Sequence, residues 1–472
     1  MNNTKIARLL TVFGIMFLSL IVYITAFDLA HHDSFAVDPT SDREKYVLRG
    51  TIFDRNKTVL AESIRDGQVQ TRLYPYRELY AHIIGYKSET HGSNEIEKYY
   101  NSDLTGKSST PLLGDAVTFA EDIKSLFSGD KNKNGYNITL TIDHELQKTA
   151  YEALGDYKGC VVAIDPQTGE VLAMVSTPSF DPSAENLDQS IKEATEANNN
   201  ALLRRSTLEA YPPGSTFKII VAASMIENGE EDFVFDDKGE LSFNVKNYGE
   251  GKGKFLGETN LESGFINSSN IYFSEAGISL GKDKITETAK NFMFGEEITL
   301  DRLGVAPSVL PEEITSNGDV TNLCLGQGNV KTTPLHLALI ASAVANDGVM
   351  MKPYIVDSIS GPAGIKTKPS VMKNCVDYST AKKLKELMKK CVESGTGSAA
   401  YIDGIEVCGK TGTAEVDTKK QTAHALFVGF APYDNPEIAI CVVAENLPHQ
   451  NTGGTVAAPI AQKVLKKYFE IN

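Results

Sequence analysis

The chain has 472 residues, of which 41% are hydrophobic, and its formal net charge is −15. This length predicts two or three globular domains with an ample core. The acidic balance includes no basic block, which argues against nucleic acid as a partner. The six cysteines show no C-x-x-C spacing, so they indicate neither a zinc site nor a dense disulfide scaffold, and we interpret them as buried thiols.

The first predicted element is an apolar run of 19 residues without a charge, LLTVFGIMFLSLIVYITAF at 9–27. Its length is close to the ~20 residues that span a bilayer. A secretory signal would have a shorter apolar region and a small-residue cleavage site. Lys5 and Arg8 precede the run while Asp28 and Asp33 follow it, so the positive-inside rule keeps the N-terminus in the cytoplasm. We therefore expect a single-pass membrane anchor with an extracytoplasmic body.

The pattern of predicted secondary structure changes near Gly159. Before it, short strand-like runs alternate with polar loops; after it, CVVAIDPQTGEVLAMVS predicts a β-hairpin. HALFVGFAP and EIAICVVAEN predict two strands near the C-terminus, and VAAPIAQKVLKKYF predicts a final helix. Strands at both ends with helices between them predict one α+β domain whose first and last strands share a sheet. The expected division is a cytoplasmic stub at 1–8, a transmembrane helix at 9–27, a connector and non-catalytic module at 28–157, and a catalytic domain at 158–472.

Two segments imitate metal sites. DKNKNG, which begins at Asp130, resembles the start of an EF-hand loop, but Thr141 stands where a bidentate Glu is required. HELQK, which begins at His144, ends in lysine where a zincin has its second histidine. We interpret the first as a turn and the second as an amphipathic helix.

The stretch YPPGSTFK, Tyr211 to Lys218, places a serine directly after a breaker cluster. Pro-Pro-Gly predicts that a new element begins at Ser215, and the apolar run that follows predicts a buried helix. Ser215 and Lys218 would then be i,i+3 neighbours, a nucleophile at a helix start with an amine within reach. An N-cap serine and a snorkelling lysine would give the same pattern, so this motif alone identifies no catalytic site.

Two further motifs follow in order. Ser-Ser-Asn at 268–270 is an S-x-N about fifty residues downstream, and Lys-Thr-Gly-Thr at 410–413 leads into a predicted strand. Each alone suits a solvated surface. The order S-x-x-K, S-x-N and K-T-G is the signature of penicillin-recognising serine enzymes. It predicts that Ser215 becomes acylated.

From Val47 onward, about nine-tenths of the 472 residues, the chain resembles a class B penicillin-binding protein, a monofunctional transpeptidase of bacterial cell-wall synthesis. RGTIFDRN resembles the family's entry into its N-terminal module. VVAIDPQTGEVLAMVSTPSFDP, GQGNVKTTPLHLALIASAVAND and HALFVGFAP resemble landmarks of its transpeptidase domain. The resemblance implies an α+β domain with a central antiparallel sheet and helices on both faces, preceded by a transmembrane helix and a small module. The middle motif departs from Ser-Asp-Asn at its central residue, where the family varies.

The resemblance also implies the chemistry. Ser215 would attack the penultimate carbonyl of a peptidoglycan stem peptide ending in D-Ala-D-Ala, D-alanine would leave, and the amine of a second stem peptide would take the acyl group. Lys218 would be the base, with a pKa lowered by burial and by Lys410. Ser268 would relay a proton to the departing amine. This chemistry needs no metal or organic cofactor.

The same resemblance assigns the binding groups. Asn270 would hold the substrate backbone, and the lysine and threonines at 410–413 would bind the terminal carboxylate. The backbone N–H groups of Ser215 and Thr413 would form the oxyanion hole. The predicted catalytic residues are Ser215, Lys218, Ser268 and Lys410, and the predicted substrate-binding residues are Asn270, Thr411, Gly412 and Thr413.

Three other functions use the same motifs. A D,D-carboxypeptidase or β-lactamase gives the acyl group to water, but the module and the anchor favour a transferase. A β-lactam-sensing receptor needs a cytoplasmic output, and only about eight residues precede the apolar run. An inactive scaffold would not need Ser215, Lys218 and Lys410. The implied partners are peptidoglycan stem peptides, β-lactam antibiotics and, since no polymerase is recognisable in the chain, a multi-span membrane glycosyltransferase.

Overall fold

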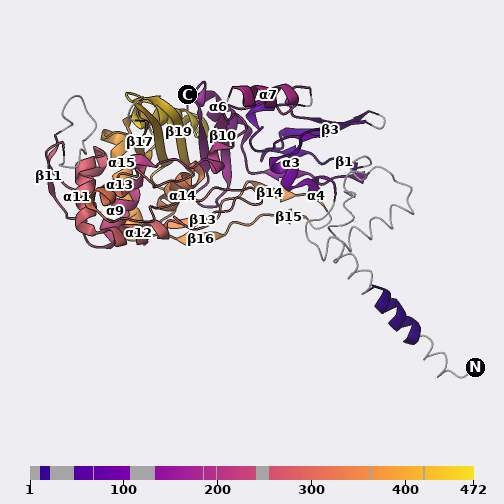
Figure 1. Ribbon diagram of the computed structural model, residues 1–472, viewed down its shortest axis with the longest axis horizontal. Helices are drawn as coiled ribbons and strands as arrows, with labels where there is room; N and C mark the ends of the chain where they lie inside the picture. Colours follow the sequence, from indigo (N-terminus) through magenta and orange to yellow (C-terminus); the bar gives the residue numbers. More distant parts are fainter. Residues whose placement is uncertain are drawn as a thin grey trace, which may run out of the picture.

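A five-stranded antiparallel sheet forms the middle of the molecule, between a helix-rich end and a strand-rich N-terminal end (Figure 1). The computed structural model describes residues 11–21, 47–66, 69–106, 133–183, 185–197, 199–240, 255–361, 364–417 and 420–471. The strands lie in the order β10-β9-β19-β18-β17. Their bounds are β9 Gly159–Ile164, β10 Val171–Thr177, β17 Cys408–Asp417, β18 Thr422–Ala431 and β19 Ile438–Pro448.

This sheet confirms two predictions about strand pairing. β9 and β10 form the predicted hairpin, and β9 also pairs with β19, so the first and last strands of the domain are neighbours. Every residue of β9 and β10 is buried because both faces of the sheet are covered. β17, which carries the K-T-G motif, is left at the edge.

Helices cover both faces of the sheet, as expected for the α+β fold. α6 (His144–Leu154) and α16 (Ala458–Tyr468) pack on one face with Val161 and Ala163, while α14 (Pro334–Ala345) packs on the other with Val162. α6 is the predicted amphipathic helix of the HELQK segment. All six cysteines are buried free thiols, which confirms that interpretation.

The helix-rich end holds the segments that carry the first two motifs (Figure 1). Its helices are α9 Lys218–Glu227, α10 Leu261–Ile266, α11 Asn270–Leu280, α12 Lys282–Asn291, α13 Asn317–Cys324 and α15 Tyr378–Ser394, with the short strands β11 Phe235–Asp237 and β12 Gly257–Thr259. α9 is apolar from Ile219 to Ala223 and buried from Lys218 to Met225. The predicted buried helix after the serine motif is therefore present.

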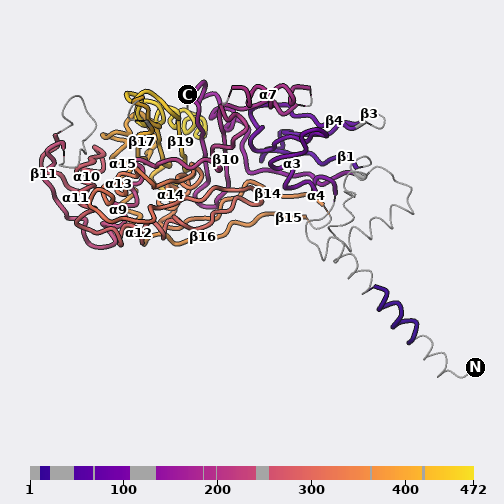
Figure 2. Tube along the Cα trace, in the orientation of Figure 1, coloured from indigo at the N-terminus to yellow at the C-terminus, as the bar shows by residue number. Residues whose placement is uncertain are grey.

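The N-terminal end is built on a six-stranded sheet in the order β15-β14-β8-β2-β3-β4. Its strands are β2 Ile52–Phe53, β3 Val59–Asp66, β4 Val69–Leu73, β8 Ile138–Leu140, β14 Val356–Ile359 and β15 Ile365–Lys366. Two of these strands follow α14 in the chain, so the sheet crosses the predicted division at residue 158. Between β13 (Val349–Met351) and β16 (Val371–Asn374) the chain runs along the molecule to this sheet and back (Figure 2).

A buried ion cluster fixes the RGTIFDRN segment in this module. The Arg49 guanidinium donates to the Glu97 carboxylate at 2.6 Å, and Arg72 Nε donates to the same carboxylate at 2.7 Å. Glu97 lies in α3 (Glu95–Tyr99), which α4 (Asn101–Leu104) follows. Removing one partner of such a buried cluster leaves an uncompensated charge, so the segment has a structural role. Within the described residues, the other α-helices are α7 Leu187–Glu196 and α8 Arg205–Leu208, and the other strands are β1 Val47–Leu48, β5 Lys87–Ser88, β6 Gly92–Ser93 and β7 Lys133–Asn134.

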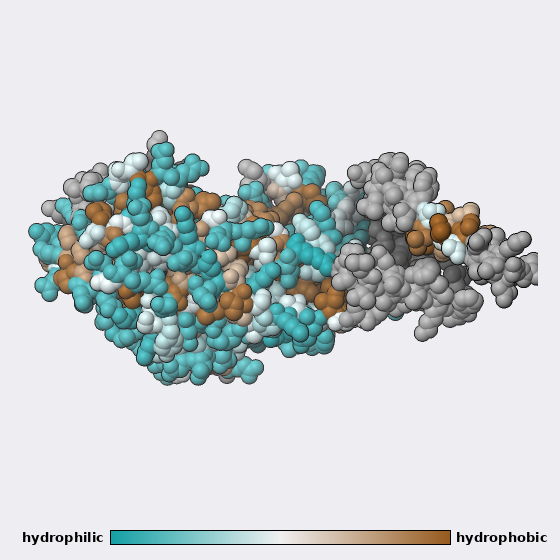
Figure 3. Space-filling model, turned by 90° about the horizontal axis from the view of Figure 1, so that it is seen from below, coloured by the Kyte–Doolittle hydropathy of each residue, from teal (hydrophilic) through white to brown (hydrophobic). Residues whose placement is uncertain are grey.

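The predicted membrane span at 9–27 lies partly outside the described residues. Residues 11–21 are helical, and their side chains are exposed along the whole segment. Figure 3 shows the apolar side chains of this helix uncovered beside the body of the molecule. Within the described part of the chain, no helix has both the length and the apolar character that a bilayer crossing needs.

Candidate active site

Ser215 lies in a 3₁₀ turn, Gly214–Phe217, and the α-helix begins only at Lys218. The predicted helix start at Ser215 is thus three residues early, because Gly214 has a left-handed φ of 55° and the chain leaves the Pro-Pro pair in a tighter turn. In a 3₁₀ turn, side chains at i and i+3 eclipse, so Ser215 and Lys218 still share a face. Ser215 is 7% exposed.

The turn is pressed against β17 and against the loop after α13. The Gly214 N–H donates to the Gly326 carbonyl at 2.9 Å. A side chain at position 214 would meet the Thr413 carbonyl at 2.7 Å, and one at position 412 would meet the Pro213 carbonyl at 2.9 Å. Glycine at 214 and 412 is therefore required for the approach. It brings the backbone of Ser215 beside that of Thr413, the two segments predicted to form the oxyanion hole.

Lys218 is completely buried, and its amine is hydrogen-bonded to the S-x-N motif. Its Nζ donates to the Ser268 carbonyl at 2.8 Å, to Ser268 Oγ at 3.3 Å and to Asn270 Oδ1 at 2.8 Å. The ring of Phe273 lies 5.5 Å from the amine. Burial, followed by the nearby Lys410, lowers the pKa of Lys218 well below its usual value. The lowered pKa makes this lysine chemically suited to accept a proton.

The Ser215 hydroxyl is not among the hydrogen-bond partners of Lys218 within the described part of the chain. In enzymes without bound substrate such contacts are often long, and they tighten in the complex. The amine of Lys218 instead links its own S-x-x-K motif to the S-x-N motif, because its acceptors belong to Ser268 and Asn270. The geometry gives a proton path from Lys218 to the Ser268 hydroxyl.

Lys410 is also completely buried, on the edge strand β17. Its Nζ donates to the Thr411 carbonyl at 3.3 Å and lies 5.4 Å from the ring of Phe265. Burial lowers the pKa of this lysine too. Its charge acts on Lys218 across the site, so the two lysines are electrostatically coupled although they belong to different motifs.

Two residues that the sequence analysis did not identify form hydrogen bonds with Thr411 and Thr413 of the last motif. Thr396, in the Ser-Gly-Thr-Gly loop after α15, has its hydroxyl 2.6 Å from the Thr411 hydroxyl. Gln327 Nε2 donates to the Thr413 carbonyl at 3.4 Å. Gln327 lies in GQGNVKTTP, a stretch resembling a family landmark, so a signal existed for it. Nothing in the sequence marks Thr396.

All eight predicted site residues lie on the segments that meet around this turn. Ser215 and Lys218 come from the turn and α9, Ser268 and Asn270 from the α10–α11 junction, and the last motif from β17. The arrangement combines a serine hydroxyl, a buried amine of lowered pKa, an amide and an edge strand that carries a lysine and two threonines, and it is suited to acyl transfer on a peptide with a free carboxylate.

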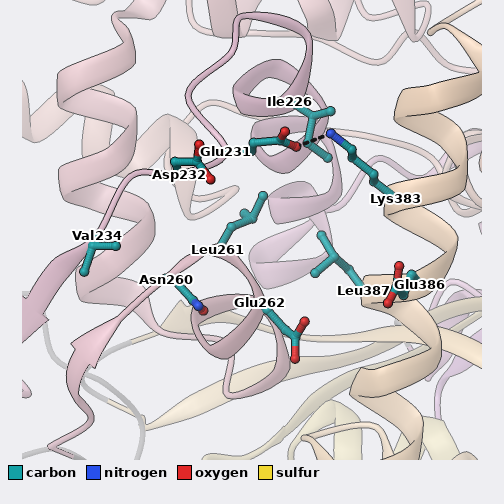
Figure 4. A pocket seen from close by; sticks show the side chains of 10 residues that line it. All are labelled: Ile226, Glu231, Asp232, Val234, Asn260, Leu261, Glu262, Lys383, Glu386 and Leu387. Carbon is teal, nitrogen blue, oxygen red and sulfur yellow. Dashed lines mark hydrogen bonds and ion pairs between the residues drawn. The ribbon is translucent and has the colours of Figure 1, made fainter.

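A hollow of about 330 Å³ lies on the helix-rich end, lined by other residues than those of the candidate active site (Figure 4). Four carboxylates surround an apolar floor there, and Glu231 is ion-paired with Lys383. Its lining residues are Ile226, Glu231, Asp232, Val234, Asn260, Leu261, Glu262, Lys383, Glu386 and Leu387. None of the predicted site residues lines it, so it is separate from the candidate active site.

Comparison with known families gives two matches that together span most of the chain. The family described as "Penicillin binding protein transpeptidase domain" matches residues 159–466. The family described as "Penicillin binding protein A dimerisation domain" matches residues 49–138.

Individual proteins and solved structures agree with these matches. The peptidoglycan D,D-transpeptidase PbpA of Mycobacterium tuberculosis is 30% identical over 98% of both chains. The PbpA of Mycolicibacterium smegmatis is 29% identical, also over 98% of both chains. The penicillin G acyl-enzyme complex of M. tuberculosis penicillin-binding protein A matches with a TM-score of 0.81 and 30% identity, over 90% of this chain and 100% of that one. With its three motifs assembled at one site and these relatives matching almost end to end, the chain belongs to the class B penicillin-binding proteins.

Proposed function

We propose that the protein is a peptidoglycan D,D-transpeptidase that crosslinks stem peptides through an acyl-enzyme on Ser215. The observation that carries this proposal is the fully buried Lys218, whose amine joins the S-x-N motif one turn from Ser215. The likeness to solved penicillin G and ceftriaxone acyl-enzyme complexes of a relative supports it. β-Lactams would acylate the same serine because they present a carboxylate and a reactive amide together.

In the acylation step, neutral Lys218 takes the Ser215 proton while Oγ attacks the penultimate carbonyl of the D-Ala-D-Ala terminus. The N–H groups of Ser215 and Thr413 stabilise the developing oxyanion. The C–N bond then breaks, and the departing D-alanine amine receives a proton through Ser268, which lies 3.3 Å from Lys218 Nζ. Every group in this step is supplied by the chain itself.

Substrate recognition falls to the other groups of the site. The positive potential of Lys410 and the hydroxyls of Thr411 and Thr413 bind the terminal carboxylate. Thr411 is held by Thr396 at 2.6 Å, so its hydroxyl is oriented before the ligand arrives. In the second step the amine of another stem peptide attacks the carbonyl of the Ser215 ester and gives a proton to Lys218; the C–Oγ bond then breaks, and Lys218 returns that proton to Ser215 Oγ as the crosslink is released.

We further propose that the protein is a single-pass protein of the bacterial cell membrane, with the transpeptidase domain outside. The apolar run at 9–27 and its flanking charges support this placement, as does the exposure of the apolar side chains at 11–21. A multi-span glycosyltransferase that polymerises the lipid-linked precursor would be the partner, with the anchor and the N-terminal module as its contact.

Penicillin labelling tests the nucleophile. The ectodomain should gain one covalent penicilloyl group, and peptide mass mapping should place it on Ser215. Ser215→Ala should take no label while its circular dichroism spectrum stays that of the wild type. Label on any other serine would contradict the assignment.

Stopped-flow acylation separates the two lysines. Lys218→Ala should slow acylation at saturating penicillin by about 10²–10⁴-fold, since a general base is lost. Lys410→Ala should mainly weaken binding, and Lys410→Arg should recover only part of that loss. Because the Lys410 charge lowers the pKa of Lys218, removing it should also move the acid limb of the rate profile to higher pH. Equal loss of the chemical step in both alanine variants would refute this division of roles.

Protease accessibility tests the orientation. Protease added outside intact spheroplasts should digest the chain beyond about Asp28, while a cytoplasmic marker protein survives. A protected Ser215 domain would rule out the proposed topology.

Site-specific crosslinking tests the partner. A photo-crosslinking residue at Ile64, which is 50% exposed on β3 of the module, should capture a multi-span membrane glycosyltransferase. The same residue at Tyr378, 62% exposed on α15 in the transpeptidase half, is the control and should not capture it. Failure at Ile64 and at other exposed module positions would count against the contact.

A further inference from the structure

The three residues of the S-x-N motif face two different groups. Ser268 and Asn270 both contact Lys218, on the substrate side. The side chain of Ser269, between them, is buried and donates from Oγ to Asp237 Oδ2 at 2.5 Å. Ser269 therefore bonds to a carboxylate that belongs to none of the three motifs, while its two neighbours in the motif contact the base Lys218.

Asp237 is buried, and a carboxylate is rarely buried unless it is paired or hydrogen-bonded. It is the last residue of β11 and is completely buried. Its other oxygen accepts from the Gly239 N–H at 2.8 Å. β11 pairs with β12, which leads into α10 and so into the motif itself. Burying an ionised carboxylate is costly unless it is paired and hydrogen-bonded, so this one is built into the motif's support.

The turn that Asp237 supports is conformationally strained. Ser268 has a left-handed φ of 55°, which a residue other than glycine rarely adopts unless its surroundings impose it. Ser269 imposes it through three bonds: its N–H donates to the Gly264 carbonyl at 2.8 Å, and its Oγ accepts from the Tyr272 N–H at 2.9 Å and donates to Asp237. A hydroxyl has one proton to give, and the carboxylate fixes its direction.

Penicillin-recognising enzymes with a Ser-Asp-Asn motif carry a carboxylate at this central position. We propose that Asp237 supplies that carboxylate here from β11, as a positioning residue that acts through Ser269 to hold Ser268 and Asn270 against Lys218. The inference deepens the proposed acyl transfer and rests on it. The carboxylate has moved from the motif to a neighbouring strand, and serine has taken its place in the motif.

The charge of Asp237 also reaches the base. Within the described residues, the charged and titratable groups that act on Lys218 are Lys410 from β17, Cys324 from α13 and Asp237 from β11. Lys410 lowers the pKa of Lys218, whereas the carboxylate of Asp237 raises it. Removing the carboxylate should therefore lower the pKa of Lys218 while loosening the turn, two effects that a purely structural contact would not combine.

The experiment is a set of variants in the penicillin acylation assay, followed from acid to neutral pH. Asp237→Asn should reduce the plateau acylation rate by about 10–100-fold through misplacement of Ser268 and Asn270. It should also move the acid limb to lower pH. Ser269→Ala keeps the carboxylate, so its plateau rate should fall with the acid limb near the wild-type position. The matched control is Asp236→Asn, on the same strand with an exposed side chain, which should leave both unchanged.

The decisive variant exchanges the two residues. Ser269→Asp combined with Asp237→Ser returns the carboxylate to the motif, where aspartate can still cap α11 as Ser269 does. The exchange should recover most of the rate lost in Asp237→Asn and bring the acid limb back. Ser269→Asp alone should be worse than the exchange, because two buried carboxylates would then face each other.

The possible results separate this inference from the function on which it rests. Wild-type rate and an unmoved acid limb in Asp237→Asn would overturn the inference while leaving the function intact. If Asp237→Asn fails to fold, the exchange and Ser269→Ala decide, and a folded exchange variant that does not exceed Ser269→Ala overturns the inference. A wild-type protein that takes no label at Ser215 would overturn the function itself.

Discussion

The buried amine of Lys218 is the constraint on which the rest of the site depends. The charged form of a lysine is costly to remove from water, and the fold buries the side chains of Lys218 and Lys410 completely, which favours their neutral forms. Between the lowered pKa in the folded state and the ordinary value of 10.5, the unfolded chain binds a proton that the folded chain does not. The free energy of unfolding therefore rises with pH across that window and is reduced on its acid side. The reactivity of the base is maintained at the expense of stability, and the large core around α9 and α14 offsets it.

The antiparallel sheet provides the rigidity that this arrangement needs. Among the described strands, β17 pairs with β18 alone, and the Ser215 turn packs against β17. The pairing with β18 runs from Cys408 to Asp417 and holds the K-T-G segment in register. The Gly214 and Gly412 positions allow the backbones of the turn and the strand to approach closely.

The sequence predicted the parts of the site that are encoded in short, ordered motifs, together with the hairpin and the pairing of the first and last strands. It could not locate Asp237 or Thr396, because each acts through a contact between segments far apart in the chain, and neither stands in a recognisable pattern. The 3₁₀ turn at Ser215 depends on the approach of Gly326 and β17, which is also a tertiary effect. Periodicity reports burial of one segment at a time, so contacts of this kind leave no trace in it.

The same limit applies to the junction between module and transpeptidase half. β14 and β15 leave the catalytic half and join the module's sheet, where β14 pairs with β8. The loop at Asp301 ties this junction from the other side: its carboxylate accepts from the Ile355 and Val356 N–H groups, and the adjacent Arg302 pairs with Asp103 at 2.7 Å. Buried strands and a charged contact thus join the two parts at several places. A partner that binds the module would therefore act on a body continuous with the catalytic half, through the strands that follow α14.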